Sequence, residues 1–81
     1  MKILVTGAAG FIGYHTIKNI LHKHANSKVI GVDSINSYYS KKLKLDRIKD
    51  LNKRFKKNFI FKKINISNKS ELIELFKKNN F

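Results

Sequence analysis

The sequence predicts an α/β fold built on a parallel β-sheet. Short apolar runs alternate with segments of helical periodicity, no proline interrupts them, and the first run ends in a glycine-rich turn. Alternation of this kind is typical of parallel sheets with right-handed crossovers. The predicted order is β-α-β-α-β-α over 81 residues, roughly half of an α/β domain if a domain has about 100–200 residues.

Three apolar, β-branched runs are predicted as strands. Lys2–Thr6 (KILVT) and Lys28–Asp33 (KVIGVD) have the dense apolar character of buried parallel strands. Residues 58–66 form the third run, with lysines on its exposed stretch.

Helical spacing predicts three helices. The first starts at Phe11, has apolar residues at positions 17, 20 and 21, and should fray near residues 24–27. The second runs from about Lys41 to Arg54. The third follows capping residues at 67–70, with acids in its first turn and lysines in its last. Phe81 stands where a fourth strand would begin, so we expect residues 1–81 to be the N-terminal part of a truncated domain.

The glycine-rich turn reads GAAGFIG over residues 7–13, a G-x-x-G-x-x-G pattern between a strand and a helix. Gly7 permits a tight turn, Gly10 leaves no Cβ to block a pyrophosphate, and Gly13 lets the helix pack closely. The amides of Phe11 and Ile12 then lie at a helix N-terminus, where free N–H groups and the helix dipole favour an anion.

Asp33 stands 20 residues after Gly13, at the end of the second predicted strand. A carboxylate at this place can accept both hydroxyls of an adenosine ribose and would repel a 2′-phosphate. The glycine pattern, its strand and helix context and this acid together predict a Rossmann-type doubly wound sheet that binds NAD rather than NADP.

These motifs carry a family resemblance. The stretch TGAAGFIG at residues 6–13 resembles the opening of the extended short-chain dehydrogenase/reductase family. Asp33 and the stretch SINSYY at 34–39, followed by Leu43, Lys44 and Arg47, resemble the UDP-glucuronate 4-epimerase branch. The resemblance covers the whole chain but only about the first third of such an enzyme.

The resemblance implies which residues contact the cofactor. Relatives carry an Asp-Leu or Asp-Ile pair that touches the adenine, and the matching pair here is Asn65-Ile66. The Asn65 side chain can still accept from the adenine amino group. The implied cofactor-binding residues are Gly7, Gly10, Phe11, Ile12, Gly13, Asp33, Ser34, Asn36, Asn65 and Ile66.

The catalytic residues implied by the resemblance, a Tyr-x-x-x-Lys pair and a Ser or Thr, would lie beyond residue 81, so no catalytic residue is expected here. Tyr14 and Lys18 match this spacing, as do Tyr38 and Lys42. We interpret both matches as chance, because both lie away from the nicotinamide end of the expected cofactor and the chain is rich in lysine.

The resemblance implies that the parent protein is an NAD-dependent nucleotide-sugar epimerase, with a nucleotide-sugar 4,6-dehydratase as the nearest alternative. It leaves open whether the parent is a homodimer. Whether the 81-residue chain has any activity alone is also open. Two alternatives from other classes are a basic nucleic-acid-binding module and an NAD-sensing regulator without catalysis.

Charge and composition limit the other classes. The net charge is +13, and eleven of the eighteen Lys and Arg residues lie between Lys41 and Lys63. No nucleic-acid motif accompanies this charge, so we interpret it as the composition of a Lys-, Asn- and Ile-rich chain. The chain has no cysteine, and we expect its three histidines, His15, His22 and His24, to be solvated rather than metal ligands.

No apolar run reaches the ~7–15 residues of a signal peptide or the ~18 residues of a membrane span. From this we expect a cytoplasmic protein without a membrane partner.

Overall fold

The computed structural model describes residues 2–35 and 41–79. Strands and helices alternate along the chain, as the sequence predicts. The elements are β1 (Lys2–Thr6), α1 (Phe11–Lys23), β2 (Lys28–Asp33), α2 (Lys41–Arg54), β3 (Phe59–Lys63) and α3 (Lys69–Lys78).

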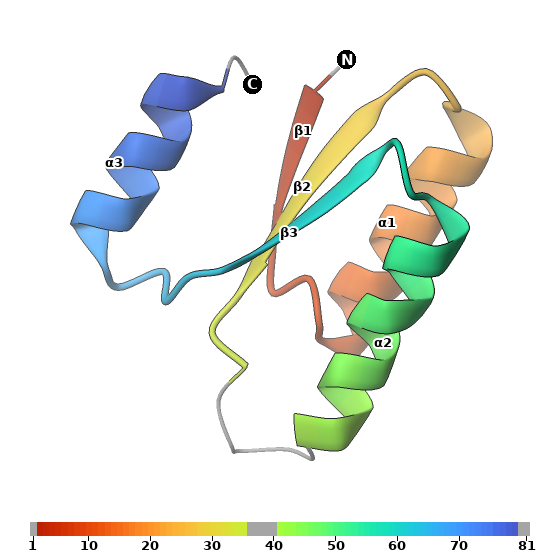
Figure 1. Ribbon diagram of the computed structural model, residues 1–81, viewed down its shortest axis with the longest axis horizontal. Helices are drawn as coiled ribbons and strands as arrows, with labels where there is room; N and C mark the ends of the chain where they lie inside the picture. The colour runs from red at the N-terminus through yellow and green to blue at the C-terminus, as the bar shows by residue number, and fades with distance from the viewer. Residues whose placement is uncertain (1, 36–40, 80–81) are drawn as a thin grey trace.

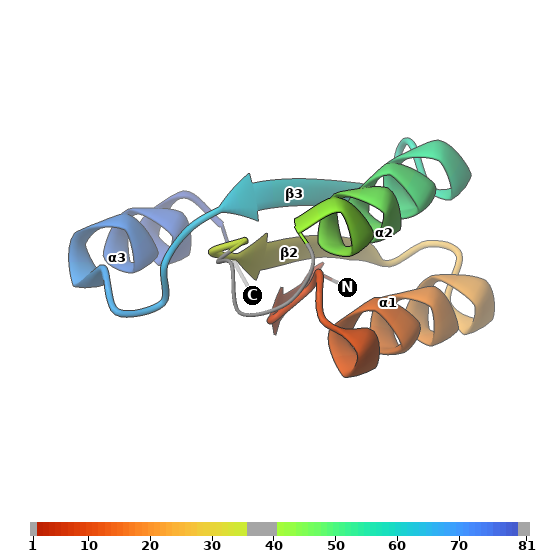
Figure 2. The same ribbon diagram turned by 90° about the horizontal axis from the view of Figure 1, so that it is seen from below.

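The three strands form one parallel sheet in the order β1-β2-β3. Helices α1 and α2 lie side by side on one face of this sheet, and α3 lies toward the other face, beyond the end of β3 (Figures 1 and 2). This arrangement is one half of a doubly wound sheet, so the predicted fold class is confirmed.

The apolar core has two parts, one on each face of the sheet, because β2 points alternate side chains to opposite faces. Val29 belongs to the larger cluster, with Ile17 and Leu21 of α1 and Leu51 of α2. Ile30 and Val32 belong to the smaller cluster under α3. Strand β2 is buried almost throughout, which explains the continuous apolar run in its sequence.

The third strand is shorter than predicted, whereas the predicted capping stretch of the third helix is confirmed. Strand β3 ends at Lys63 rather than at residue 66, because the Asn65 side chain accepts from the backbone N–H of Ser67 at 3.0 Å and turns the chain. Within the predicted capping stretch 67–70, it is Asn68 that caps α3, accepting from the backbone N–H of Glu71 at 3.2 Å.

The glycine turn between β1 and α1 is compact. Gly7 has φ of +65°, a left-handed conformation that favours glycine, and its carbonyl accepts from the backbone N–H of Gly10 at 3.0 Å. A Cβ at Gly13 would lie 2.2 Å from the Gly7 carbonyl oxygen, whereas a Cβ at Gly10 would approach the same oxygen only to 3.3 Å. Gly13 therefore packs directly on the turn, and only a residue without a side chain fits there.

We predict that Gly13→Ala destabilises the fold more than Gly10→Ala does. The first change forces two backbone segments apart, and overpacking of this kind costs roughly 1–3 kcal/mol, or a fall of about 4–8 °C in melting temperature per kcal/mol in a domain of this size. Thermal melts followed by circular dichroism measure the difference, at a concentration of trimethylamine N-oxide, which strengthens burial, that gives the unsubstituted chain a cooperative transition. Equal melting temperatures for the two variants would contradict the close packing of Gly13.

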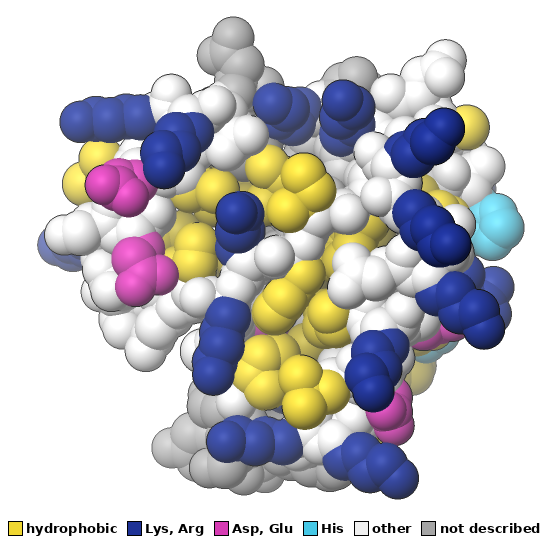
Figure 3. Space-filling model, in the orientation of Figure 1, with side chains coloured by type: hydrophobic (Ala, Val, Ile, Leu, Met, Phe, Trp, Pro, Cys, Tyr) yellow, Lys and Arg dark blue, Asp and Glu magenta, His cyan; other side chains and the backbone are white. Residues whose placement is uncertain are grey.

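Much apolar surface remains open to solvent. Within the described residues β1 pairs with β2 alone, and three large side chains of β3 and α3 are more than half exposed, Ile60, Ile73 and Phe76. Figure 3 shows hydrophobic side chains exposed in the middle of one face, with Lys and Arg side chains around them. An unpaired strand edge and an open apolar face both favour association.

We predict that the 81-residue chain alone is poorly folded at room temperature and shows no cooperative unfolding transition on heating. A three-stranded core of this size buries too small a share of its surface to offset the conformational entropy of the chain, and the net charge of +13 favours expansion. Circular dichroism on heating tests this. A sharp melt above about 45 °C, the usual range for mesophilic domains, would show that the chain folds stably by itself.

Candidate functional site

A cavity of about 650 Å³ lies between the glycine turn, the start of α1 and the first half of α2. It brings together five of the residues that the sequence predicts as cofactor contacts, Gly7, Gly10, Phe11, Ile12 and Gly13. Four further residues complete its lining: Thr6, Leu43, Lys44 and Arg47.

The α1 end of this cavity is suited to an anion. Gly10 is the N-cap of α1 and has no side chain to cap the first N–H groups of the helix. These N–H groups have no partner within the helix, and no acidic residue lies in the first turn. The side chains of Phe11 and Ile12 are 65% and 78% exposed, so they leave the helix end accessible. Free amides and the helix dipole together favour a phosphate group at this end.

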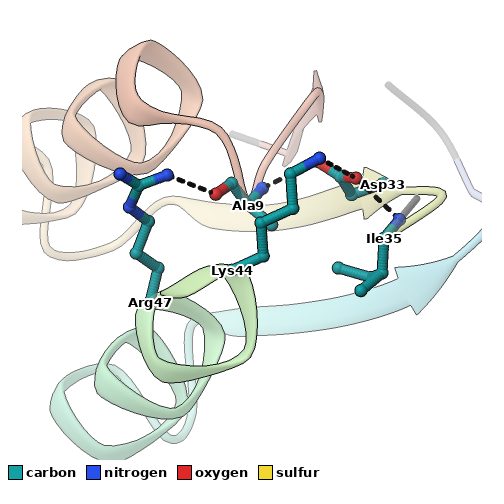
Figure 4. A network of polar contacts seen from close by, with 5 residues as sticks. All are labelled: Ala9, Asp33, Ile35, Lys44 and Arg47. Carbon is teal, nitrogen blue, oxygen red and sulfur yellow. Dashed lines mark hydrogen bonds and ion pairs between the residues drawn. The ribbon is translucent and has the colours of Figure 1, made fainter. Parts of the chain in front are cut away.

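Two basic side chains of α2 border the same cavity. Arg47 Nη1 donates to the Ala9 carbonyl oxygen at 3.0 Å, and Lys44 Nζ lies 3.5 Å from Asp33 Oδ1 (Figure 4). Sequence reasoning gave these two residues no role of their own. Their spacing of three does place them on one face of a helix, but only the packing of α2 beside α1 shows that this face meets the glycine turn.

Asp33 lies at the carboxyl end of β2, as predicted, and is 6% exposed. Its Oδ2 accepts from the backbone N–H of Ala9 at 3.0 Å, and its Oδ1 accepts from that of Ile35 at 2.8 Å (Figure 4). With Lys44 also on Oδ1, three of about four lone-pair sites of the carboxylate have protein partners. Asp33 does not line the cavity itself. Its hydrogen bond to Ala9 instead stabilises the glycine turn, a role that the sequence did not reveal.

A second glycine outside the motif also shapes the site. A Cβ at Gly31 of β2 would lie 2.7 Å from the Ala8 Cβ and 3.0 Å from a ring carbon of Phe59. The glycine turn is thus seated directly on β2. The backbone N–H of Ala8 donates to the Val32 carbonyl at 3.1 Å, which fixes the turn beside Asp33.

The remaining predicted contacts lie outside this cavity. Ser34 is half-buried directly after Asp33, and Asn36 falls outside the described residues. Asn65 is exposed, and its Oδ1 accepts from the backbone N–H and hydroxyl of Ser67 at 3.0 and 2.8 Å. Ile66 is 59% exposed. An adenine contact by Asn65 would share an oxygen that already holds the local turn.

Of the two Tyr-x-x-x-Lys matches, Tyr38 lies outside the described residues. Tyr14 does not line the cavity, and its hydroxyl donates a hydrogen bond to Asp50 of α2. In the described part of the chain, no helix is long and apolar enough to cross a membrane.

Comparison with known sequences agrees with this geometry. A family model described as GDP-mannose 4,6 dehydratase matches residues 4–81. The chain is 49% identical over 76 residues to the protein CapI of Staphylococcus aureus, and 40% identical over 73 residues to a UDP-glucuronate 4-epimerase of Thermodesulfobacterium geofontis. These matches cover 94% and 90% of the chain but 21% of each relative, so the chain spans about a fifth of their length.

Solved structures show the same arrangement. UDP-glucuronic acid 4-epimerase of Bacillus cereus, in complex with UDP-glucuronic acid and NAD, superposes with a TM-score of 0.80 at 37% identity, over 96% of this chain and 24% of that one. The dTDP-glucose 4,6-dehydratase of Bacillus anthracis, in complex with NAD, also gives a TM-score of 0.80, at 31% identity, over 96% and 23%.

The family match covers nearly the whole chain, and it agrees with the parallel three-stranded sheet and with the glycine turn between β1 and α1. The chain belongs to the GDP-mannose 4,6 dehydratase family of NAD-dependent epimerases and dehydratases, and it corresponds to their N-terminal region.

Proposed function

We propose that residues 1–81 bind the adenosine diphosphate half of NAD and form the N-terminal part of a nucleotide-sugar epimerase of the UDP-glucuronate 4-epimerase type. The observation that carries the proposal is the cavity between the glycine turn and α2, where the free end of α1, Lys44 and Arg47 converge. The relatives that resemble this chain in structure are complexes with NAD.

The residues fit a dinucleotide pyrophosphate. A Cβ at Gly10 would meet only the Gly7 oxygen, so the absence of a side chain there leaves room on the cavity side. The amides of Phe11 and Ile12 supply donors, and Arg47 supplies a positive charge at the same cavity. These groups would bind and orient the phosphates without taking part in bond making.

Asp33 would hold the adenosine ribose. One lone-pair site remains on its carboxylate beside the three protein donors, and the long Lys44 contact can yield a second. Asp33 would therefore accept one ribose hydroxyl directly and the other in exchange with Lys44, while its charge disfavours a 2′-phosphate.

When bound, NAD supplies hydride transfer in such enzymes, and the protein supplies position and electrostatics. The two relatives with NAD catalyse different reactions, one a 4-epimerisation and one a 4,6-dehydration. Since fold does not fix the reaction, the 4,6-dehydratase remains the second candidate.

A chimera that joins residues 1–81 to the remainder of the Bacillus cereus epimerase gives this segment the rest of a complete enzyme.

The direct test is NAD binding to the 81-residue chain and to the chimera, by isothermal titration. The proposal requires saturable binding by the chimera and competition by adenosine diphosphate. A chimera that folds cooperatively but shows no saturable NAD binding would refute it.

We predict that Gly10→Val weakens NAD binding by the chimera about ten- to a hundredfold and lowers its melting temperature little. The branched side chain would occupy the space of the pyrophosphate, a steric cost of roughly 1–3 kcal/mol. Ala25→Val, at an exposed position remote from the cavity, is the matched control and should bind as the parent chimera does. Undiminished NAD binding by Gly10→Val would exclude the glycine turn as the pyrophosphate site.

We predict that Asp33→Ala changes the ratio of NAD to NADP affinity about ten- to a hundredfold in favour of NADP, since hydrogen bonds to charged groups contribute roughly 1.5–3 kcal/mol. The variant should also melt lower, because the N–H groups of Ala9 and Ile35 lose their acceptor. Affinities for both dinucleotides are measured in the folded variant. The assignment of Asp33 to the ribose fails if that ratio stays constant.

A further inference from the structure

Helices α1 and α2 are joined by a set of part-buried and exposed polar side chains that the proposed site does not use. The Tyr14 hydroxyl donates a hydrogen bond to Asp50 Oδ2, which lies 36 residues further along the sequence. Arg54 Nε donates to the other oxygen, Asp50 Oδ1, at 2.7 Å. Lys18 Nζ lies 5.0 Å from the centre of the Tyr14 ring, on the face of the aromatic system.

The Tyr14 side chain leaves α1 next to the glycine turn. Tyr14 directly follows Gly13, and its backbone N–H donates to the Gly10 carbonyl at 2.9 Å. The side chain therefore extends from the first turn of α1, whose N–H groups border the cavity. Neither Tyr14 nor Asp50 lines that cavity, so any effect of their bond on a ligand must pass through other residues.

On α2 the bond continues a row of polar contacts. Lys44, Arg47 and Asp50 are spaced by three and share one face of the helix. Along this face Lys44 contacts Asp33 and Arg47 contacts the Ala9 carbonyl, and the third member of the row, Asp50, meets Tyr14. These three contacts join α2 to the end of β2, to the glycine turn and to α1, in that order.

Apolar packing gives the first half of α2 little support. Its buried residues, Ile48 and Leu51, lie in its second half, whereas Leu43 and Leu45 are 49% and 48% exposed. Lys44 and Arg47 themselves connect this half to β2 and to the glycine turn, and Asp50 connects the start of the second half to α1.

The hydrogen bond also shifts the pKa values of both partners. The bond to Asp50 raises the pKa of Tyr14 above its ordinary value, helped by partial burial. Donation by Tyr14, and then by Arg54, lowers the pKa of Asp50. Asp50 is thus charged and Tyr14 protonated at neutral pH, the state in which the bond is made.

We propose that the Tyr14–Asp50 bond is a positioning contact for dinucleotide binding, which holds α2 against α1 so that Lys44 and Arg47 face the cavity. The inference rests on the proposed function. It also gives the Tyr14–Lys18 spacing a physical role, since Lys18 covers the Tyr14 ring beside Asp50.

The test compares NAD affinity in Tyr14→Phe, Arg47→Met and the double variant, using the full chain and, for a complete fold, the chimera. Tyr14→Phe should weaken NAD binding about three- to tenfold, because Arg47 loses its position. The double variant should lose less NAD affinity than the sum of the two single losses, since contacts in one network are not additive. If the bond were purely structural, Tyr14→Phe would lower the melting temperature, and the losses of NAD affinity in the two single variants would add in the double variant.

Two carboxylates of α2 provide the matched control. Asp50→Asn should weaken NAD binding as Tyr14→Phe does, whereas Asp46→Asn, an equal change of charge at an exposed position of the same helix, should not. If the parent chain and chimera do not bind NAD, the proposed function itself fails. If they bind NAD and Tyr14→Phe and Asp50→Asn bind equally well, or the double variant is additive, the positioning role alone is overturned.

Discussion

The arrangement of the site depends on one close approach, that of Gly13 to the Gly7 carbonyl. No Cβ fits at Gly13, and this contact brings the first turn of α1 onto the chain that leaves β1. The helix end is therefore held beside the turn with its amides uncapped by any side chain. The same compact turn buries Ala8 and Ala9 completely, which places the Ala9 N–H within reach of Asp33.

Strand parity connects this turn to β2. Side chains two apart on a strand share a face, so Val29, Gly31 and Asp33 all point toward α1 and α2. Val29 packs in the core there, Gly31 leaves space for Ala8, and Asp33 meets the turn itself. A bulky residue at the middle position would lift the turn from the sheet and separate Asp33 from Ala9. The acid and the glycines of the motif thus act as one packed unit.

Local signals predicted most of the fold, and packing between elements explains what they missed. Apolar runs and helical spacing predict the six elements. The predicted limits of α2 agree with the structure, where Ile48 and Leu51, at helical spacing, are its buried residues. The sequence places the end of β3 too late, because the apolar run continues through the buried Ile64 while the Asn65 side chain turns the chain directly after it. The roles of Lys44 and Arg47 depend on how α2 is rotated against α1, which no short-range pattern reports.

The rotation of α2 against α1 also determines which of its Lys and Arg side chains reach the cavity. Composition alone treats the Lys and Arg residues between Lys41 and Lys63 as equivalent solvated groups, and several are exposed. Two of them, Lys44 and Arg47, instead face the cavity, and a third, Arg54, pairs with Asp50. These three residues lie near one face of α2. The positive charge of the helix can therefore reflect both a lysine-rich composition and a site for an anion. The face of α2 that Tyr14 and Asp50 hold against α1 therefore carries the cations that border the site.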